Sequence, residues 1–195
     1  MDELRAHIIV AEANGDVTAL HEARINSDHT IRAAALGSLA RLALLDVNDL
    51  QAAVRDPHPA VRCRAIELSI DEDNIDIAAL LNDEDDLVVE TAAWALGERG
   101  PASPETLSQL ASVARDHEVS ICREAAVAAL GAIGDPAGLA TILDAMSDRA
   151  PVRRRAVLAL APFDGEDVTA ALRAALEDRD RQVRQAAEDL LGSEI

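Results

Sequence analysis

Two histidine–glutamate pairs are the residues of this chain that most directly suggest chemistry: His21 with Glu22, and His117 with Glu118. An imidazole beside a carboxylate can hold a transition metal or move a proton. That chemistry requires a fold that brings both pairs to one place. The residues at 29 and 58 are also histidines, but they follow helix-capping positions, so we expect them at turns or on the surface rather than in a metal site.

Other catalytic groups are sparse. All 18 basic residues are arginines, so no lysine is present for a phosphate-binding loop or a Schiff base. Cys63 and Cys122 lack metal-like spacing, and we expect both to be reduced thiols. No serine or cysteine lies near a histidine in a catalytic motif, and paired carboxylates carry no specificity in so acidic a chain. We therefore identify no catalytic residue, metal or cofactor, and expect a protein that is not an enzyme.

The charge of the chain restricts its partners. A formal net charge of -18 repels phosphate backbones and anionic lipid before contact, so we expect neither nucleic acid nor membrane as a partner. Nine acidic residues and no basic one lie in 71–90, which we interpret as a solvated face. A salt-adapted host and a GC-rich genome would both explain this composition.

The start of the chain and its apolar runs bear on location. Residues 1–7 lack the basic-then-apolar layout of a signal peptide, and no apolar run approaches the roughly 20 residues of a membrane span. We therefore expect a cytoplasmic protein. Hydrophobic residues make up 49% of the chain but aromatics only 1%, so Ala, Leu, Val and Ile must fill its interior.

One pattern recurs six times and indicates the elements that must position these groups. Each copy begins with an aliphatic residue or cysteine, usually followed by arginine, with alanine four places on and usually leucine eight places on. The copies start at Ile31, Val61, Val88, Cys122, Val152 and Val183. In the second copy, Ser69 replaces the leucine, and we expect Leu68 and Ile70 to supply the lost contact. Places zero, four, seven and eight share one face of a helix, so each copy predicts an amphipathic helix with an alanine seam.

Shorter helices are expected between these copies, over 16–24, 47–55, 75–81, 104–115, 136–146 and 167–177. Ser103 and Asp135 each precede a proline, which is typical of a helix start. Gly97, Gly131 and Gly192 stand where the repeated helices are expected to end.

The six copies resemble the short HEAT repeat of the phycobilin-lyase type, over roughly residues 25–195. The resemblance implies an all-α fold: a right-handed α-solenoid of about six HEAT-like helix pairs with an extra N-terminal helix. We expect one solenoid over 1–195, with an N-terminal capping helix in 1–14. Its repeats would span about 15–45, 46–71, 72–100, 101–134, 135–164 and 165–195.

An arginine–aspartate ladder is the structural signature that this family implies. Its arginines, each one place after a start, are Arg32, Arg62, Arg123, Arg153 and Arg184. The expected acidic partners, which precede the starts, are Asp28, Asp56, Asp116, Asp148 and Asp180. Val89 interrupts the ladder in the third copy. We interpret the ladder as structural, since aspartate caps helices and arginine bridges neighbours.

Places two, three and six point away from the seam, and in a HEAT stack they should line the concave surface. The middle of the sixth-place row is apolar, with Trp94, Ala128 and Leu158. The residues expected around this row are Arg64, Glu90, Thr91, Glu124, Arg154 and Arg155. An exposed tryptophan rimmed by Arg and Glu has the composition of an interface anchor, whereas arginine stems covering the indole would be purely structural. Both interpretations stay open.

The leading hypothesis is a protein-interaction scaffold that binds a peptide or helix of a partner on this face, as a monomer or weak homo-oligomer. The alternative is a factor like the phycobilin lyases, which attach a chromophore. Deoxyhypusine hydroxylase, a HEAT-type iron enzyme, carries His–Glu pairs on inner helices, but the corresponding places here, such as Glu124 and Ala125, do not match it. HEAT-type DNA glycosylases need a basic, aromatic-rich groove, which this composition lacks.

Overall fold

The computed structural model describes residues 2–192, without the side chains of residues 2–5 and 7. Within that range the chain forms twelve α-helices and two short 3-10 helices, and no strand. The predicted all-α fold is confirmed. None of the described helices combines the length and apolar character needed to cross a membrane. The expected last repeat runs to 195, and residues 193–195 lie outside the described part.

The chain divides into two compact units, Met1–Ile77 and Ala78–Ile195. The first contains α1 (Asp2–Asn14), α2 (Val17–Ala23), α3 (His29–Arg41), α4 (Val47–Ala53) and α5 (Pro59–Glu67). Helix α3 packs on α1, α2 and α5, so α1 is the extra helix at the N-terminal end of this unit. The core around α3 is formed by Ile8, Ala11, Leu20, Ala23, Ile31, Ala35 and Leu39.

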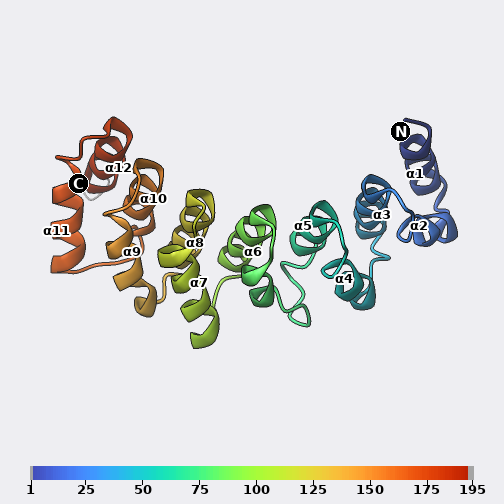
Figure 1. Cartoon of the computed structure of the whole chain (residues 1–195), viewed down its shortest axis with the longest axis horizontal. Helices are drawn as coiled ribbons and strands as arrows, with labels where there is room; N and C mark the ends of the chain where they lie inside the picture. The colour runs from blue at the N-terminus through green and yellow to red at the C-terminus, as the bar shows by residue number, and fades with distance from the viewer. Residues whose placement is uncertain (1, 193–195) are drawn as a thin grey trace. The chain divides into compact units, whose positions relative to one another are not determined.

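The second unit stacks four repeated helices: α6 (Asp86–Arg99), α8 (Ser120–Ile133), α10 (Ala150–Ala159) and α12 (Arg181–Gly192). Each contacts the next along the stack, and in Figure 1 they follow one another along one side of this unit. The other side carries η1 (Ala78–Asn82), α7 (Pro104–Asp116), η2 (Pro136–Gly138), α9 (Leu139–Ala145) and α11 (Glu166–Ala175). Two layers of helices therefore form this unit.

The alanine seam lies where the repeat pattern predicts it. All six fourth-place alanines are 0% exposed: Ala35, Ala65, Ala92, Ala126, Ala156 and Ala187. A methyl group is the smallest side chain that still covers a helix backbone, so these positions let neighbouring helices approach closely. In the irregular second copy, the Ser69 hydroxyl is buried and donates to the carbonyl of Ala65, and Leu68 packs against the core as expected.

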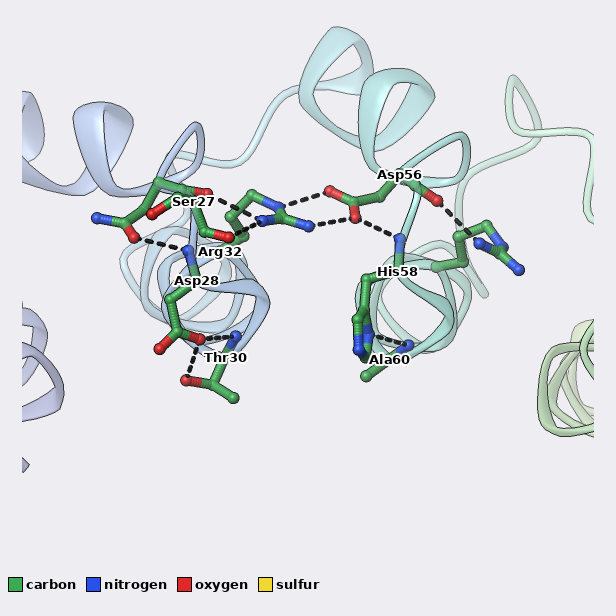
Figure 2. Close-up of polar contacts among 9 residues, drawn as sticks. Ser27, Asp28, Thr30, Arg32, Asp56, His58 and Ala60 are labelled. Atoms are coloured by element: carbon green, nitrogen blue, oxygen red, sulfur yellow. Dashed lines mark hydrogen bonds and ion pairs between the residues drawn. The ribbon is translucent and has the colours of Figure 1, made fainter. Parts of the chain in front are cut away.

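Arginine–aspartate pairs join successive repeats within each unit. In the first unit, Arg32 donates through Nε and Nη2 to both carboxylate oxygens of Asp56, at 2.7 and 2.6 Å (Figure 2). Its Nη1 turns back to the carbonyls of Asn26 and Ser27. Each such arginine thus fixes the turn before its own helix and the turn before the next repeated helix.

The second unit repeats this arrangement. Arg123 makes the same two-pronged contact with Asp148, at 2.6 and 2.8 Å, and Arg153 makes it with Asp178, at 2.8 and 2.7 Å. The hydrogen bonds from Arg123 and Arg153 lower the pKa of Asp148 and Asp178 below the ordinary aspartate value. All four side chains are largely buried, so these are interior ion pairs.

The sequence interpretation assigned three of the ladder acids wrongly. Asp28 and Asp180 instead cap helices by accepting the backbone N–H groups of Thr30 and Gln182. Asp116, at the end of α7, accepts from the hydroxyl of Ser112. Asp178, which pairs with Arg153, lies five residues before Val183, the start of the sixth copy. Asp28 and Asp180 each lie three residues before the start of a copy, and each reaches only the first turn of its own helix.

Two further expectations were wrong. The expected helix over 75–81 is only the 3-10 helix η1, because the chain before it forms turns: the N–H of Ile75 donates to the carbonyl of Glu72, and the N–H of Ile77 donates to the carbonyl of Ile75. Gly97 and Gly131 lie inside α6 and α8 rather than after them. The helix ends are marked instead by glycines with positive φ, at 100 and 134.

Glu12 fastens α1 to α3 and makes this contact sensitive to acid. Its carboxylate accepts two bonds from Arg41, both 2.6 Å, and one from the buried hydroxyl of Ser38, at 2.7 Å. The hydrogen bond from Arg41 is the main reason that the pKa of Glu12 falls from 4.5 to about 2. A lowered pKa stabilises the folded form above the ordinary value and ceases to do so as the pH falls through the lowered one.

We therefore expect the docking of α1 to weaken between pH 4.5 and about 2. In Glu12→Gln this pH dependence should be absent, and amide exchange in residues 2–14 should be faster at neutral pH. Hydrogen exchange followed by mass spectrometry measures both effects. Glu22→Gln, on the exposed surface of α2, serves as the control. Equal exchange of α1 in wild type and Glu12→Gln at pH 7 would contradict the expectation.

Candidate functional site

A hollow of about 410 Å³ opens on the second unit around Trp94, and we call it the Trp94 pocket. Its lining residues come from α6, α8 and α10: Glu90, Trp94, Gly97, Glu98, Ile121, Glu124, Ala125, Ala128, Ala129, Ala132 and Arg155. Trp94, the only tryptophan in the sequence, is 45% exposed. Nearly half of the tryptophan surface is therefore accessible to solvent in this hollow.

Helix α6 supplies the tryptophan and two carboxylates on one stripe. Glu90, Trp94 and Glu98 are spaced by four residues, so they lie one above another along the helix. The opposite side of α6 carries Val88, Ala92 and other residues that are fully buried in the seam. Burial of that side fixes the rotation of α6 and turns the stripe toward the hollow.

Helix α8 forms the opposite wall with small side chains. Ala125, Ala128 and Ala132 leave the space that larger residues would fill. Glu124, also on this wall, is paired with Arg155 of α10 at 3.3 Å. The wall facing Trp94 is thus a methyl-lined surface with a charge pair at its edge.

A second hollow of about 470 Å³ adjoins the first along α10, and we call it the Leu158 hollow. Leu158 is 36% exposed there. The two hollows share Ala128, Ala132 and Arg155. The other lining residues of the Leu158 hollow are Gly131, Ala159, Ala161 and Pro162. An exposed indole and an exposed isobutyl group therefore lie at two adjoining hollows of one surface.

The structure brings together most of the site residues predicted from sequence. Glu90, Trp94, Glu124, Ala128 and Arg155 line the Trp94 pocket, and Leu158 lines the hollow beside it. The remaining three lie elsewhere. The Thr91 hydroxyl donates to the carbonyl of Leu87, Arg154 is exposed outside both hollows, and Arg64 belongs to the first unit, where it pairs with Glu67 and lies over Gly37.

Sequence reasoning missed Glu98 and Ile121 as lining residues. Glu98 lies one helical turn beyond Trp94, so extending the four-residue stripe by one step would have found it. Ile121 directly precedes the fourth start and is 43% exposed. Its place was not among those assigned to the surface.

The two His–Glu pairs belong to different units of the chain. His21 lies on α2 in the first unit, and His117 follows α7 in the second. His117 instead lies near Asp86 and Cys122, and one ligand atom from each falls within 4.8 Å of the others. Among the described residues, these three have the composition of a metal site.

The hydrogen bonds around this cluster oppose both metal binding and nucleophilic chemistry. His117 Nδ1 accepts the backbone N–H of Val119, which leaves the proton on the nitrogen that would have to bind a metal. The Cys122 thiol donates to the carbonyl of Asp86. Burial is the main cause that raises the pKa of Cys122 to about 11, so the thiol is neither exposed nor activated. We interpret the cluster as packing between α6 and α8.

Comparisons with known proteins agree with this arrangement of helices. A family model described as HEAT repeats matches residues 76–131 and 123–192, together more than half of the chain. Crystal structures of two engineered proteins each match 91% of this chain and 95% and 97% of their own, with 18% and 20% identity and TM-scores of 0.59 and 0.60. A designed armadillo repeat protein matches 89% of this chain and 98% of its own, with 16% identity and a TM-score of 0.54. No curated protein gives a significant match. At these identities, likeness to the solved structures shows the fold alone.

Proposed function

Since the chain belongs to the HEAT-repeat family, we propose that it is a protein-binding scaffold whose second unit captures a peptide or helix of a partner. The observation that carries this proposal is the exposure of Trp94 inside a hollow walled by alanines. Tryptophan is the residue most often found to dominate binding energy at protein interfaces. The alanines behind Trp94, which are Ala92, Ala93 and Ala95, are already fully buried, and 45% of the Trp94 surface is left in water for a partner to cover.

The proposal also includes the cellular location of the scaffold. Both cysteines are free and buried, which fits a reducing compartment, so we propose the cytoplasm. We propose a role in binding rather than catalysis, and the Cys122 thiol fits that role because burial raises its pKa to about 11.

Chromophore attachment of the phycobilin-lyase type is the less favoured function. The short repeats resemble that family, but the Trp94 pocket presents Glu90 and Glu98, which would repel the carboxylates of a linear tetrapyrrole. An absorbance change on mixing the purified chain with a bilin would favour this alternative. No change is expected.

Substitutions at the two anchors test the scaffold function. Trp94→Ala and Leu158→Asp should each weaken partner binding by about 30-fold, corresponding to about 2 kcal/mol for an anchoring residue. The measurement is quantitative mass spectrometry of proteins retained by the tagged chain from its own cells, followed by affinity measurement with the retained partner. Val10→Asp, at a 54% exposed position in the first unit, is the matched control.

The pattern across these three variants decides the outcome. Partners lost from both anchor variants and kept by Val10→Asp would support the proposal, provided that circular dichroism shows all three to be folded. If the anchor variants retain the same partners with the same affinities as wild type, binding does not occur at Trp94.

A further inference from the structure

We infer that the Trp94 pocket takes an arginine side chain from a basic segment of the partner, with the guanidinium lying on the indole between Glu90 and Glu98. This inference rests on the proposed function and specifies its partner. Three observations carry it: the charge of the stripe on α6, the exposed face of the indole, and the small side chains opposite.

The carboxylates beside Trp94 lack a cation. Among the described residues, neither Glu90 nor Glu98 forms an ion pair, whereas Glu124 on the opposite wall is paired with Arg155. Side chains four residues apart on a helix lie about 5–6 Å apart at Cβ, so one carboxylate lies on each side of the indole. The net charge of -18 adds an attractive field for any cation that approaches. The occupant with complementary charge is therefore basic.

Arginine fits this arrangement better than lysine. A guanidinium is planar, stacks on tryptophan and forms two parallel hydrogen bonds with a carboxylate, while an ammonium is a strongly hydrated point charge. The alanines of α8 leave room above the indole for a flat group. The pocket can thus satisfy the stacking face and the N–H edge of one guanidinium at once.

The Leu158 hollow sets the spacing of a second contact. Packed helices lie about 8–10 Å apart, so a hollow between α6 and α8 and one between α8 and α10 are separated by about that distance. In the extended polyproline II conformation a chain advances about 3.1 Å per residue and completes one turn in three residues, so side chains three residues apart lie on the same face, about 9 Å apart. The expected occupant is an extended segment that carries an arginine and, three residues before or after it, an aliphatic side chain.

A random hexapeptide library, displayed and selected on the full chain, tests this inference, with counter-selection on Trp94→Ala. Selected peptides should be enriched in arginine, with leucine, isoleucine or valine three residues away. The best peptide is then synthesised with arginine and with citrulline, a neutral side chain of the same shape. Its binding is followed by fluorescence of Trp94. Citrulline should weaken binding at least tenfold. Glu90→Gln combined with Glu98→Gln should reduce the preference for arginine over citrulline to less than threefold.

Each outcome of the selection is decisive. Enriched peptides without arginine, or equal affinity for arginine and citrulline, would overturn the inference and leave the proposed function standing. Enrichment of lysine over arginine would overturn the assignment to a stacked guanidinium. If no sequence is enriched on the wild-type chain over Trp94→Ala, the inference fails, and the proposed function is decided separately by the partners that the anchor variants retain.

Discussion

Arg153→Ala should lower the free energy of unfolding of the second unit by about 3–5 kcal/mol, the typical cost of leaving one partner of a buried ion pair unpaired. Arg153 is 6% exposed, and it donates to both oxygens of Asp178 and to the carbonyl of Asp148. Its removal leaves a buried carboxylate without its cation and frees two turns. Denaturant unfolding followed by circular dichroism and by Trp94 fluorescence measures the loss.

The neighbouring arginine supplies a matched control. Arg154 is exposed and forms no ion pair within the described residues, so Arg154→Ala should change stability by no more than about 0.5 kcal/mol. The same residue type is removed from the adjacent position of the same helix, so helix propensity and net charge change equally in both variants. Equal destabilisation by the two substitutions would show that the ladder does not stabilise the fold.

The same pair predicts how stability depends on pH. The hydrogen bond from Arg153 lowers the pKa of Asp178, so its stabilising contribution is present above the unfolded value of about 3.9 and is lost as the pH falls below it. Arg153→Ala removes the cause of the shift. The gap in stability between wild type and this variant should therefore narrow as the pH is lowered toward 2.

Gly131→Ala should destabilise the second unit by about 1–3 kcal/mol, despite the higher helix propensity of alanine. A Cβ at this position would lie 2.6 Å from Ala159 Cβ and 2.7 Å from Ala159 Cα on α10. Because one of these atoms is backbone, helix α10 would have to move as a whole. The change in the denaturant midpoint measures the effect.

Two other glycines extend this prediction to a series of three substitutions with decreasing loss of stability. At Gly97, an added Cβ would meet Ala129 Cα at 3.0 Å, so Gly97→Ala should cost less. At Gly192 it would meet nothing within 4 Å, so Gly192→Ala should be neutral or slightly stabilising. The opposite order of the three midpoints would show that close helix approach does not decide which residues these positions accept.

The repeat pattern predicted the helices that form the alanine seam well, because their buried residues recur at fixed intervals along the sequence. The fourth-place alanines and the exposed face of α6 both follow from a period of 3.6 residues, which can be read from sequence. That periodicity also placed Trp94, Ala128 and Leu158 on the same surface. Contacts within one repeated helix were therefore predictable.

What sequence reasoning missed depends on contacts between repeats. Asp178 and Asp180 both precede the same helix, and only the path of the turn decides which one meets Arg153. Gly131 was read as a helix end because its tight contact with Ala159 comes from the next repeat. Near residue 75 the chain forms turns instead of a helix, and local composition alone did not reveal them.

The arginine–aspartate ladder also bears on the length of each repeat. Each of its two-pronged contacts joins an arginine to an aspartate 24 or 25 residues later. The third copy carries Val89 in place of the arginine, and there the next start, Cys122, comes 34 residues after Val88, the widest interval in the chain. In this copy, where the arginine is missing, the added length lies in the helix that follows: α7 has 13 residues, whereas α4 and α9 have 7 each.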